Sequence, residues 1–83
     1  MTLYMDVHHV AGGVTAADVA DAHAADLKVQ DAYGVDYKHY WVDEAAGTIF
    51  CLVEAPDEEA ANAVHREAHG LVADEIHPVV PGA

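Results

Sequence analysis

Apolar and polar residues follow two different periods along the chain, and these periods predict where strands and helices lie. Residues 3–10 alternate between the two types, as expected for a β-strand with one buried face. The Gly12–Gly13 pair ends this strand, and Thr15 is a typical N-cap residue for a following helix. We expect that helix to continue to about Tyr33, because Gly34 is the kind of residue that closes a helix.

The next segments predict a β-hairpin. Residues 35–42 are rich in Tyr, Trp and Val, and residues 48–54 carry apolar side chains on both faces. The acidic segment 43–47 ends in glycine and separates them by the length of a hairpin loop. The two strands are therefore predicted to pair as antiparallel neighbours.

A second helix and a short last strand complete the pattern. Pro56 followed by three acidic residues is a typical helix start, and we expect this helix to run to about His69 before Gly70 ends it. Residues 75–80 predict a final strand, in which Pro78 favours an edge position because it cannot donate a hydrogen bond to a neighbouring strand.

The predicted order β-α-β-β-α-β over residues 1–83 indicates a single α+β domain with a ferredoxin-like fold. With right-handed crossovers, its four strands form one antiparallel sheet with both helices on one face. Because residues 48–54 are apolar on both faces, with Phe50 and Leu52 on one of them, the face without helices also needs cover. A second copy of the chain is the simplest cover, so we expect a homodimer.

Charge and composition narrow the range of partners. The chain has 3 Lys and Arg, 15 Asp and Glu, and 7 His, for a formal net charge of −12. Such a chain repels phosphate backbones and anionic lipids, which excludes nucleic acid and membrane surfaces as partners, and it attracts cations. The single cysteine, Cys51, excludes an intrachain disulfide and fits a reducing compartment. With no long apolar segment, a soluble cytoplasmic protein is expected.

His65 and His69 lie four residues apart on the second predicted helix and therefore project from one face. Two imidazoles at this spacing can chelate one divalent metal ion. The pattern places them beside the core stripe of the helix rather than within it. A metal site at the surface and a solvated helix flank that carries two histidines are both open at this point. The His-Glu-x-x-His pattern of zinc proteases is absent.

His23 falls within the apolar stripe of the first predicted helix, with Asp26 and Gln30 at the edge of that stripe. Polar side chains that face a core need partners, because an unpaired buried polar group is costly. One interpretation is a buried hydrogen-bond network of His23 with Asp26 or a strand residue. The other is a functional site, in which His23 is a metal ligand or a general base tuned by a carboxylate. In both, His23 is at least half buried and hydrogen-bonded.

His8 and His9 are adjacent on the first predicted strand, so they point to opposite faces of the sheet. We expect His9 to face the helices, together with the apolar residues of its alternation, Leu3, Met5 and Val7. His8 then lies on the open face with Asp6. Cys51 has no basic neighbour in the sequence and is predicted to be an inert buried thiol.

Four runs stand out: His-x-x-Asp-x-x-x-Gln at residues 23–30, Tyr-Trp-Val-Asp-Glu at 40–44, Phe-Cys-Leu-Val-Glu-Ala-Pro at 50–56 and His-Arg-Glu-Ala-His-Gly at 65–70. With them, nearly the whole chain resembles a family of small bacterial proteins long classed as a domain of unknown function, one branch of which binds nickel. The resemblance implies a ferredoxin-like homodimer that binds Ni²⁺ at surface sites. The family's pattern matches this chain at His9, His23, Asp26, His65 and His69, which are the five residues we predict as metal ligands.

The expected function is therefore that of a non-enzymatic protein that sequesters or buffers Ni²⁺ through histidine and carboxylate ligands. Cu²⁺ should bind such ligands at least as tightly, and Zn²⁺ can compete. The main alternative is a dimeric ferredoxin-like enzyme, a cofactor-light oxygenase or isomerase, with a pocket formed by His9, His23 and Asp26. A third interpretation is an interaction module whose histidines are incidental.

Overall fold

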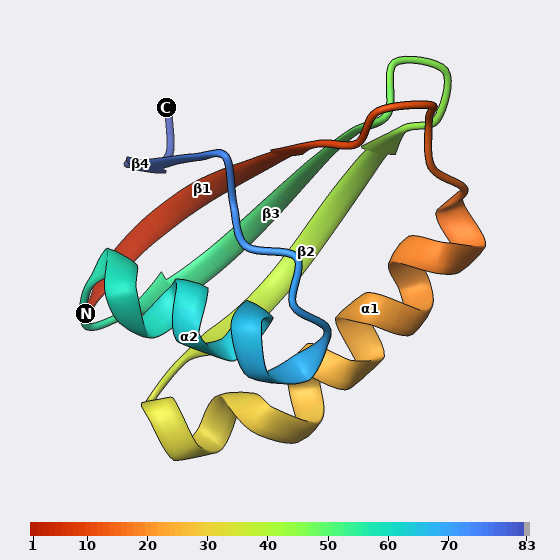
Figure 1. Ribbon diagram of the computed structural model, residues 1–83. Helices are drawn as coiled ribbons and strands as arrows, with labels where there is room; N and C mark the ends of the chain where they lie inside the picture. The colour runs from red at the N-terminus through yellow and green to blue at the C-terminus, as the bar shows by residue number, and fades with distance from the viewer. Residues whose placement is uncertain (83) are drawn as a thin grey trace.

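The structure is a computed structural model that describes residues 1–82, and its elements follow the predicted order (Figure 1). The elements are β1 (Thr2–His9), α1 (Ala16–Val29), the 3₁₀-helix η1 (Gln30–Tyr33), β2 (Asp36–Asp43), β3 (Thr48–Ala55), α2 (Glu58–Ala68) and β4 (Glu75–Pro78). The predicted strands and helices are therefore all present.

The four strands form one antiparallel sheet in the order β2-β3-β1-β4, and both helices cover the same face of it (Figure 1). This is the ferredoxin-like α+β fold that the sequence predicts. The strand β4 lies at the edge of the sheet, in agreement with the position of Pro78. The strands β1 and β3 are central, so side chains on their covered face lie beneath the helices.

Side chains fix where the two helices begin. Thr15 Oγ1 accepts a hydrogen bond from the amide of Asp18 at 3.1 Å, and Asp57 Oδ1 accepts one from the amide of Ala60 at 2.8 Å. Each bond satisfies one of the amide groups that a helix leaves free at its start. The two caps set the rotation of each helix, and with it the side chains that face the sheet.

The first helix ends earlier than predicted. Its α-helical part stops at Val29, and η1 continues as a tighter turn until Gly34, whose φ of +66° is the left-handed conformation that suits glycine. Gln30 lies at this change, and its Oε1 accepts a hydrogen bond from the Tyr37 amide at 2.8 Å. Gln30 therefore joins the end of α1 to β2 and does not enter the polar cluster described below.

The face of β1 that points toward the helices is the opposite of the face predicted. Tyr4, Asp6 and His8 lie beneath the helices and are 8%, 0% and 2% exposed, whereas His9 is exposed on the open face. The predictions that His9 faces the helices and that His8 and Asp6 face away are therefore wrong. Alternation defines two faces but does not say which is covered, and here the polar face is buried because its charged groups find partners inside the protein.

The apolar core lies between the sheet and the helices, and it includes Val53 and Val64, both 0% exposed. On the other face, Trp41 and Phe50 are direct neighbours on β2 and β3 and are 52% and 37% exposed. The open face of the sheet therefore carries large exposed apolar side chains. Over residues 1–82, none of the helices is long and apolar enough to cross a membrane.

Candidate metal centre

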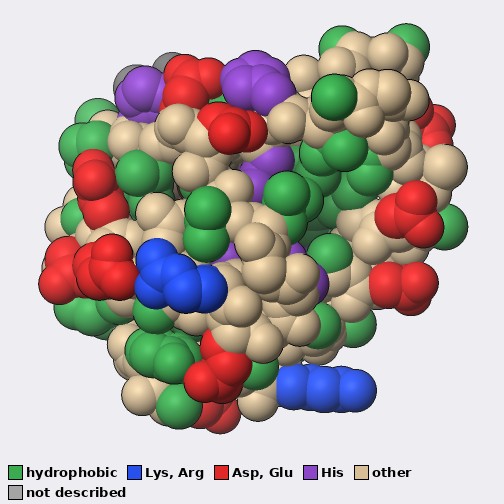
Figure 2. Space-filling view, in the orientation of Figure 1, with side chains coloured by type: hydrophobic (Ala, Val, Ile, Leu, Met, Phe, Trp, Pro, Cys, Tyr) green, Lys and Arg blue, Asp and Glu red, His purple; other side chains and the backbone are tan. Residues whose placement is uncertain are grey.

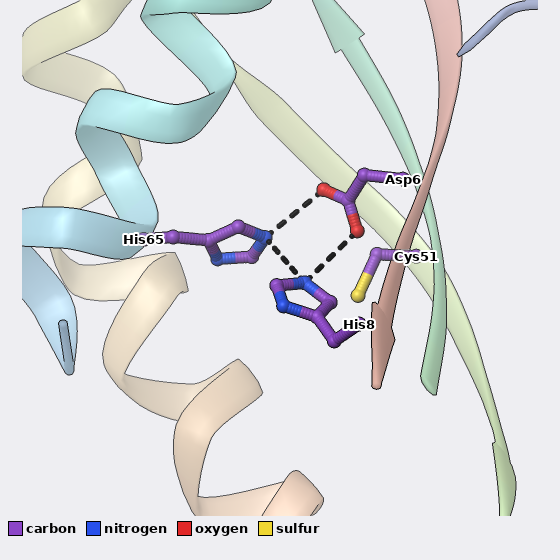
Figure 3. A group of neighbouring side chains, drawn as sticks. All are labelled: Asp6, His8, Cys51 and His65. Carbon is purple, nitrogen blue, oxygen red and sulfur yellow. Dashed lines mark hydrogen bonds and ion pairs between the residues drawn. The ribbon is translucent and has the colours of Figure 1, made fainter. Parts of the chain in front are cut away.

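Four buried side chains gather between the sheet and α2 (Figure 3). Asp6 and His8 come from β1, Cys51 from β3 and His65 from α2. Asp6 and Cys51 are direct partners across the β1–β3 ladder, and His8 lies on the same face of β1. One nitrogen, oxygen or sulfur atom from each residue lies within 4.8 Å of those of the other three. We call this group the inner cluster.

Asp6 is the central acceptor of the inner cluster. Its Oδ2 accepts hydrogen bonds from His65 Nε2 at 3.0 Å and from the Tyr37 hydroxyl at 2.9 Å, and its Oδ1 lies 3.1 Å from His8 Nε2. Burial acts to raise the pKa of this carboxyl, but the hydrogen bond from His65 and the close contacts with the His65 and His8 rings outweigh burial and hold the pKa well below its usual range. Asp6 is therefore a fully buried carboxylate at neutral pH.

Two atoms of the inner cluster are buried without a hydrogen bond from any residue in the described range 1–82, namely Asp6 Oδ1 and His8 Nδ1. The contact of Asp6 Oδ1 with His8 Nε2 is close enough for an ion pair but lacks the alignment of a hydrogen bond. Buried polar atoms nearly always have partners, because burying them unpaired is costly. The unused lone pairs of Asp6 Oδ1 are available to a cation.

His65 lies between two carboxylates. Its Nδ1 donates to Asp26 Oδ1 at 3.0 Å, and its Nε2 donates to Asp6 Oδ2 at 3.0 Å. Burial acts to lower the pKa of the ring, but the hydrogen bonds and charges of Asp26 and Asp6 prevail and raise its pKa to about 9. At neutral pH His65 is therefore an imidazolium ion with a carboxylate at each nitrogen.

A second group shares His65 and lies nearer the surface. Asp26 from α1, His65 and His69 have one ligand atom each within 4.8 Å of the others, and His69 Nε2 lies 3.1 Å from Asp26 Oδ1. Burial lowers the pKa of His69 and outweighs the opposing effect of Asp26, and its Nδ1 accepts a hydrogen bond from the Leu71 amide. The neutral ring therefore carries its proton on Nε2, toward Asp26. We call these three residues the outer cluster.

A small pocket opens onto both clusters. Its cavity volume is about 20 Å³, and its lining includes His8, His65 and His69 together with Asp26, Cys51, His23 and Tyr40. A water molecule needs roughly 10–15 Å³ of such space, so the pocket has room for an ion or a water molecule or two. Figure 2 shows histidine side chains inside a hollow of the surface, on a face where acidic side chains outnumber basic ones.

The structure brings together three of the five residues predicted as metal ligands. Asp26, His65 and His69 form the outer cluster, but His65 is only 1% exposed, so the prediction that it flanks the core at the surface is wrong. The physical reason is that α2 is rotated so that His65 points at β1, where Asp6 Oδ2 accepts the hydrogen bond from His65 Nε2. His69, at the C-terminal end of α2, keeps 17% of its side chain exposed.

His23 lines the pocket but stands outside both clusters. It is partly buried, and its ring packs against Tyr40 with 4.7 Å between ring centroids. Burial lowers its pKa despite the charge of Asp26. Among the described residues it forms no hydrogen bond or ion pair with Asp26, whose Oδ1 instead contacts His65 and His69. The expectation that His23 is at least half buried is confirmed, and the expected hydrogen bond to Asp26 or to a strand residue is wrong for residues 1–82.

His9 lies on the other face of the sheet, away from the pocket. Its Nε2 is 2.9 Å from Glu75 Oε2, and His77 Nε2 is 3.3 Å from the other oxygen of Glu75. The side chains of His9, Glu75 and His77 are 55%, 48% and 58% exposed. A pocket that combines His9 with His23 and Asp26, as in the enzyme interpretation, is therefore not formed within one chain.

Sequence reasoning missed Asp6, His8 and Cys51, which complete the inner cluster. A signal was present, because Tyr4, Asp6 and His8 share one face of a strand whose ladder partner includes Cys51. A strand face that carries an acid and a histidine is predicted to be solvent-exposed unless the partners of these side chains are known. The partner that they share, His65, lies 59 residues from Asp6 and 57 from His8 in the sequence.

Comparison with known proteins identifies the family and agrees with the fold. The family described as nickel responsive protein SCO4226-like matches residues 4–79. The crystal structure of SCO4226 from Streptomyces coelicolor A3(2) superposes with a TM-score of 0.89 at 44% sequence identity, over 98% of this chain and 99% of that one. No curated protein matches the chain. The chain therefore belongs to the SCO4226-like family of nickel responsive proteins.

Proposed function

We propose that this protein binds a late divalent metal ion, Ni²⁺ foremost, and sequesters or buffers it, with the outer cluster as the binding site. The observation that carries the proposal is the convergence of Asp26, His65 and His69 at the pocket. Imidazole and carboxylate are ligands that suit Ni²⁺, and Cu²⁺ and Zn²⁺ compete for the same donors. The family name, which describes nickel responsive proteins, supports Ni²⁺ as the first ion to test.

The charge of the site favours a cation. Without metal, two carboxylates, Asp6 and Asp26, share one imidazolium, His65, so the three groups carry a net charge of −1. A divalent ion that replaces the His65 proton beside Asp26 neutralises this charge without burying a new one. The chain as a whole adds long-range attraction, since its formal net charge is −12.

The size of the pocket favours binding over catalysis on an organic molecule. A cavity of about 20 Å³ admits an ion and one or two water molecules. The three ligands of the outer cluster leave coordination positions for those waters, so the ion can enter and leave through the pocket. Exchange of this kind suits a protein that takes up and releases a metal ion.

We also propose that the protein acts as a cytoplasmic homodimer. Trp41 and Phe50 are neighbours on the open face, where a second copy would cover them. A free thiol, Cys51, is buried in the core and suits a reducing compartment.

The test is isothermal titration calorimetry with Ni²⁺ at pH 7.5 on the wild type, His69→Ala and His77→Ala. His69 is partly exposed at a helix end, so its loss should leave the fold intact, and His77 is a matched exposed control outside the pocket. We expect Ni²⁺ affinity at the pocket to fall tenfold or more in His69→Ala and to be unchanged in His77→Ala. Equal affinity in wild type and His69→Ala would overturn the assignment of the site.

A further inference from the structure

We propose that His65 is the shared ligand of a two-ion centre, with one divalent cation in the inner cluster at Nε2 and a second in the outer cluster at Nδ1. This inference rests on the proposed function, because the outer ion is the one proposed above. It adds a second ion, held by Asp6, His8 and Cys51, and a bridge between the two ions through one imidazole ring.

The inner cluster has the composition and spacing of a closed four-ligand site. His65 Nε2 lies 3.3 Å from His8 Nε2 and 3.0 Å from Asp6 Oδ2, and Cys51 Sγ completes the group within 4.8 Å (Figure 3). In a tetrahedral site with bonds of about 2.0–2.3 Å, ligand atoms are about 3.3–3.8 Å apart. The donors of Asp6, His8 and His65 therefore need to separate by only roughly a few tenths of an ångström to admit an ion, and Cys51 Sγ, within 4.8 Å of them, needs to approach by at most about 1 Å.

The hydrogen-bond pattern of the inner cluster is incomplete without a cation. Two imidazole nitrogens, from His8 and His65, face each other at 3.3 Å, so at most one hydrogen atom fits between them. Asp6 Oδ1 and His8 Nδ1 are buried and lack a hydrogen bond from residues 1–82. A divalent ion among the donors would use Asp6 Oδ1 directly and would replace the Nε2 proton of His65.

The two clusters meet at opposite nitrogens of one ring. Nδ1 of His65 faces Asp26 at 3.0 Å, and Nε2 faces Asp6 at 3.0 Å. Each nitrogen now holds a proton directed at a carboxylate, and each proton marks a position where a cation can bind. With both ions bound, the ring loses both protons to solvent and becomes an imidazolate, and Cys51 loses its thiol proton. His8 and His69 keep one proton each by moving it to Nδ1, and in His69 this breaks the hydrogen bond from the Leu71 amide.

The two positions differ in access. All four inner residues are buried, which is typical of a closed site that holds its ion for long periods. The outer cluster has three protein ligands and opens to the pocket, so water completes its coordination and the ion exchanges. The thiolate of Cys51 would favour Cu⁺ and Zn²⁺ at the inner position, beside Ni²⁺ at the outer one.

The experiment uses Cu²⁺ as the probe, because two Cu²⁺ ions joined by an imidazolate couple their unpaired electrons and lose their electron paramagnetic resonance signal. The protein is the variant His9→Ala, His77→Ala, Cys51→Ser. Its first two changes remove the exposed histidines of the open face, and the third prevents reduction of Cu²⁺ by the thiol. We expect the signal to grow with the first equivalent and to fall toward zero with the second.

Two independent spins per chain at two equivalents would overturn the two-ion centre. Tight Zn²⁺ binding that stops at one ion in the variant His9→Ala, His77→Ala, which keeps Cys51, would overturn it too. Both results would leave the proposed function intact. Adding His69→Ala should remove the outer ion, so a single uncoupled signal should persist. If no bound ion depends on His69, the proposed function fails as well. A second readout is Co²⁺ on the chain with Cys51 present, where thiolate-to-metal absorption is expected and should vanish in Cys51→Ser.

Discussion

His65 on α2 donates a hydrogen bond from Nε2 to the carboxylate of Asp6 on β1, at 3.0 Å, with both residues at most 1% exposed. The second helix is therefore joined to a central strand by a buried ion pair in addition to apolar contacts. Removing one partner of such a pair leaves the other charge buried and uncompensated, which is usually far more costly than the pair itself is stabilising.

The first prediction concerns Asp6. Asp6→Asn should lower the free energy of unfolding at pH 7 by about 1–3 kcal/mol, because the His65 Nε2 proton and the Tyr37 hydroxyl lose their charged acceptor while Asp26 still compensates the charge of His65. Urea unfolding followed by circular dichroism measures the change. Glu75→Gln, which also removes a carboxylate beside two histidines but at an exposed position, should leave stability almost unchanged. Equal stability of Asp6→Asn and wild type would show that the buried pair is unimportant.

The second prediction concerns stability at alkaline pH. The pKa of His65 is about 9 in the folded chain against an ordinary 6.5, so its contribution is complete below pH 6.5 and is lost as pH rises through 9. The free energy of unfolding of the metal-free protein should therefore fall by up to about 3 kcal/mol between pH 6.5 and 9. Cys51→Ser should show the same fall in the free energy of unfolding. This control would show that the fall comes from His65 and not from ionisation of the Cys51 thiol in the unfolded chain. A flat profile over this range would contradict the pairing of His65.

The third prediction concerns the competition between metal and protons. Because His65 must lose a proton to bind an ion, Ni²⁺ affinity should rise by about tenfold per pH unit from pH 7 to pH 9. A site made of ordinary histidines would instead level off above a pKa of about 6.5. Calorimetry in two buffers of different ionisation enthalpy gives the number of protons released. Affinity that is constant above pH 7 would mean that His65 is not a ligand.

The fourth prediction concerns the open face of the sheet. Trp41→Glu should convert the proposed dimer to a monomer, because it places a charge among the side chains that a second copy would cover. Light scattering coupled to size-exclusion chromatography measures the mass. Leu27→Glu on α1 is the matched control, since Leu27 is 45% exposed but lies on the helical side. A wild type that is already monomeric at micromolar concentration would contradict the proposed dimer.

Much of the fold followed from local patterns, and most of the site did not. Alternation, the Thr15 cap and the glycines at 34 and 47 are local signals, and each predicted an element or turn that is present. The side of β1 that is buried depends on Asp6 meeting His65, a contact between residues 59 positions apart. Apolar Leu3 and Met5 made the opposite face look buried. Spacing within one helix found His65 and His69, but only the folded chain joins them to Asp26.

The measurement that tests the central claim most directly is a crystal structure of the protein soaked in Ni²⁺, with anomalous scattering used to place each ion. The account predicts an ion bonded to His65 Nδ1, Asp26 and His69 Nε2, at about 2.0–2.2 Å from each, with the hydrogen bond between His65 and Asp26 gone. Ions found only at exposed positions such as His9 and His77, with the bond from His65 to Asp26 intact, would contradict it.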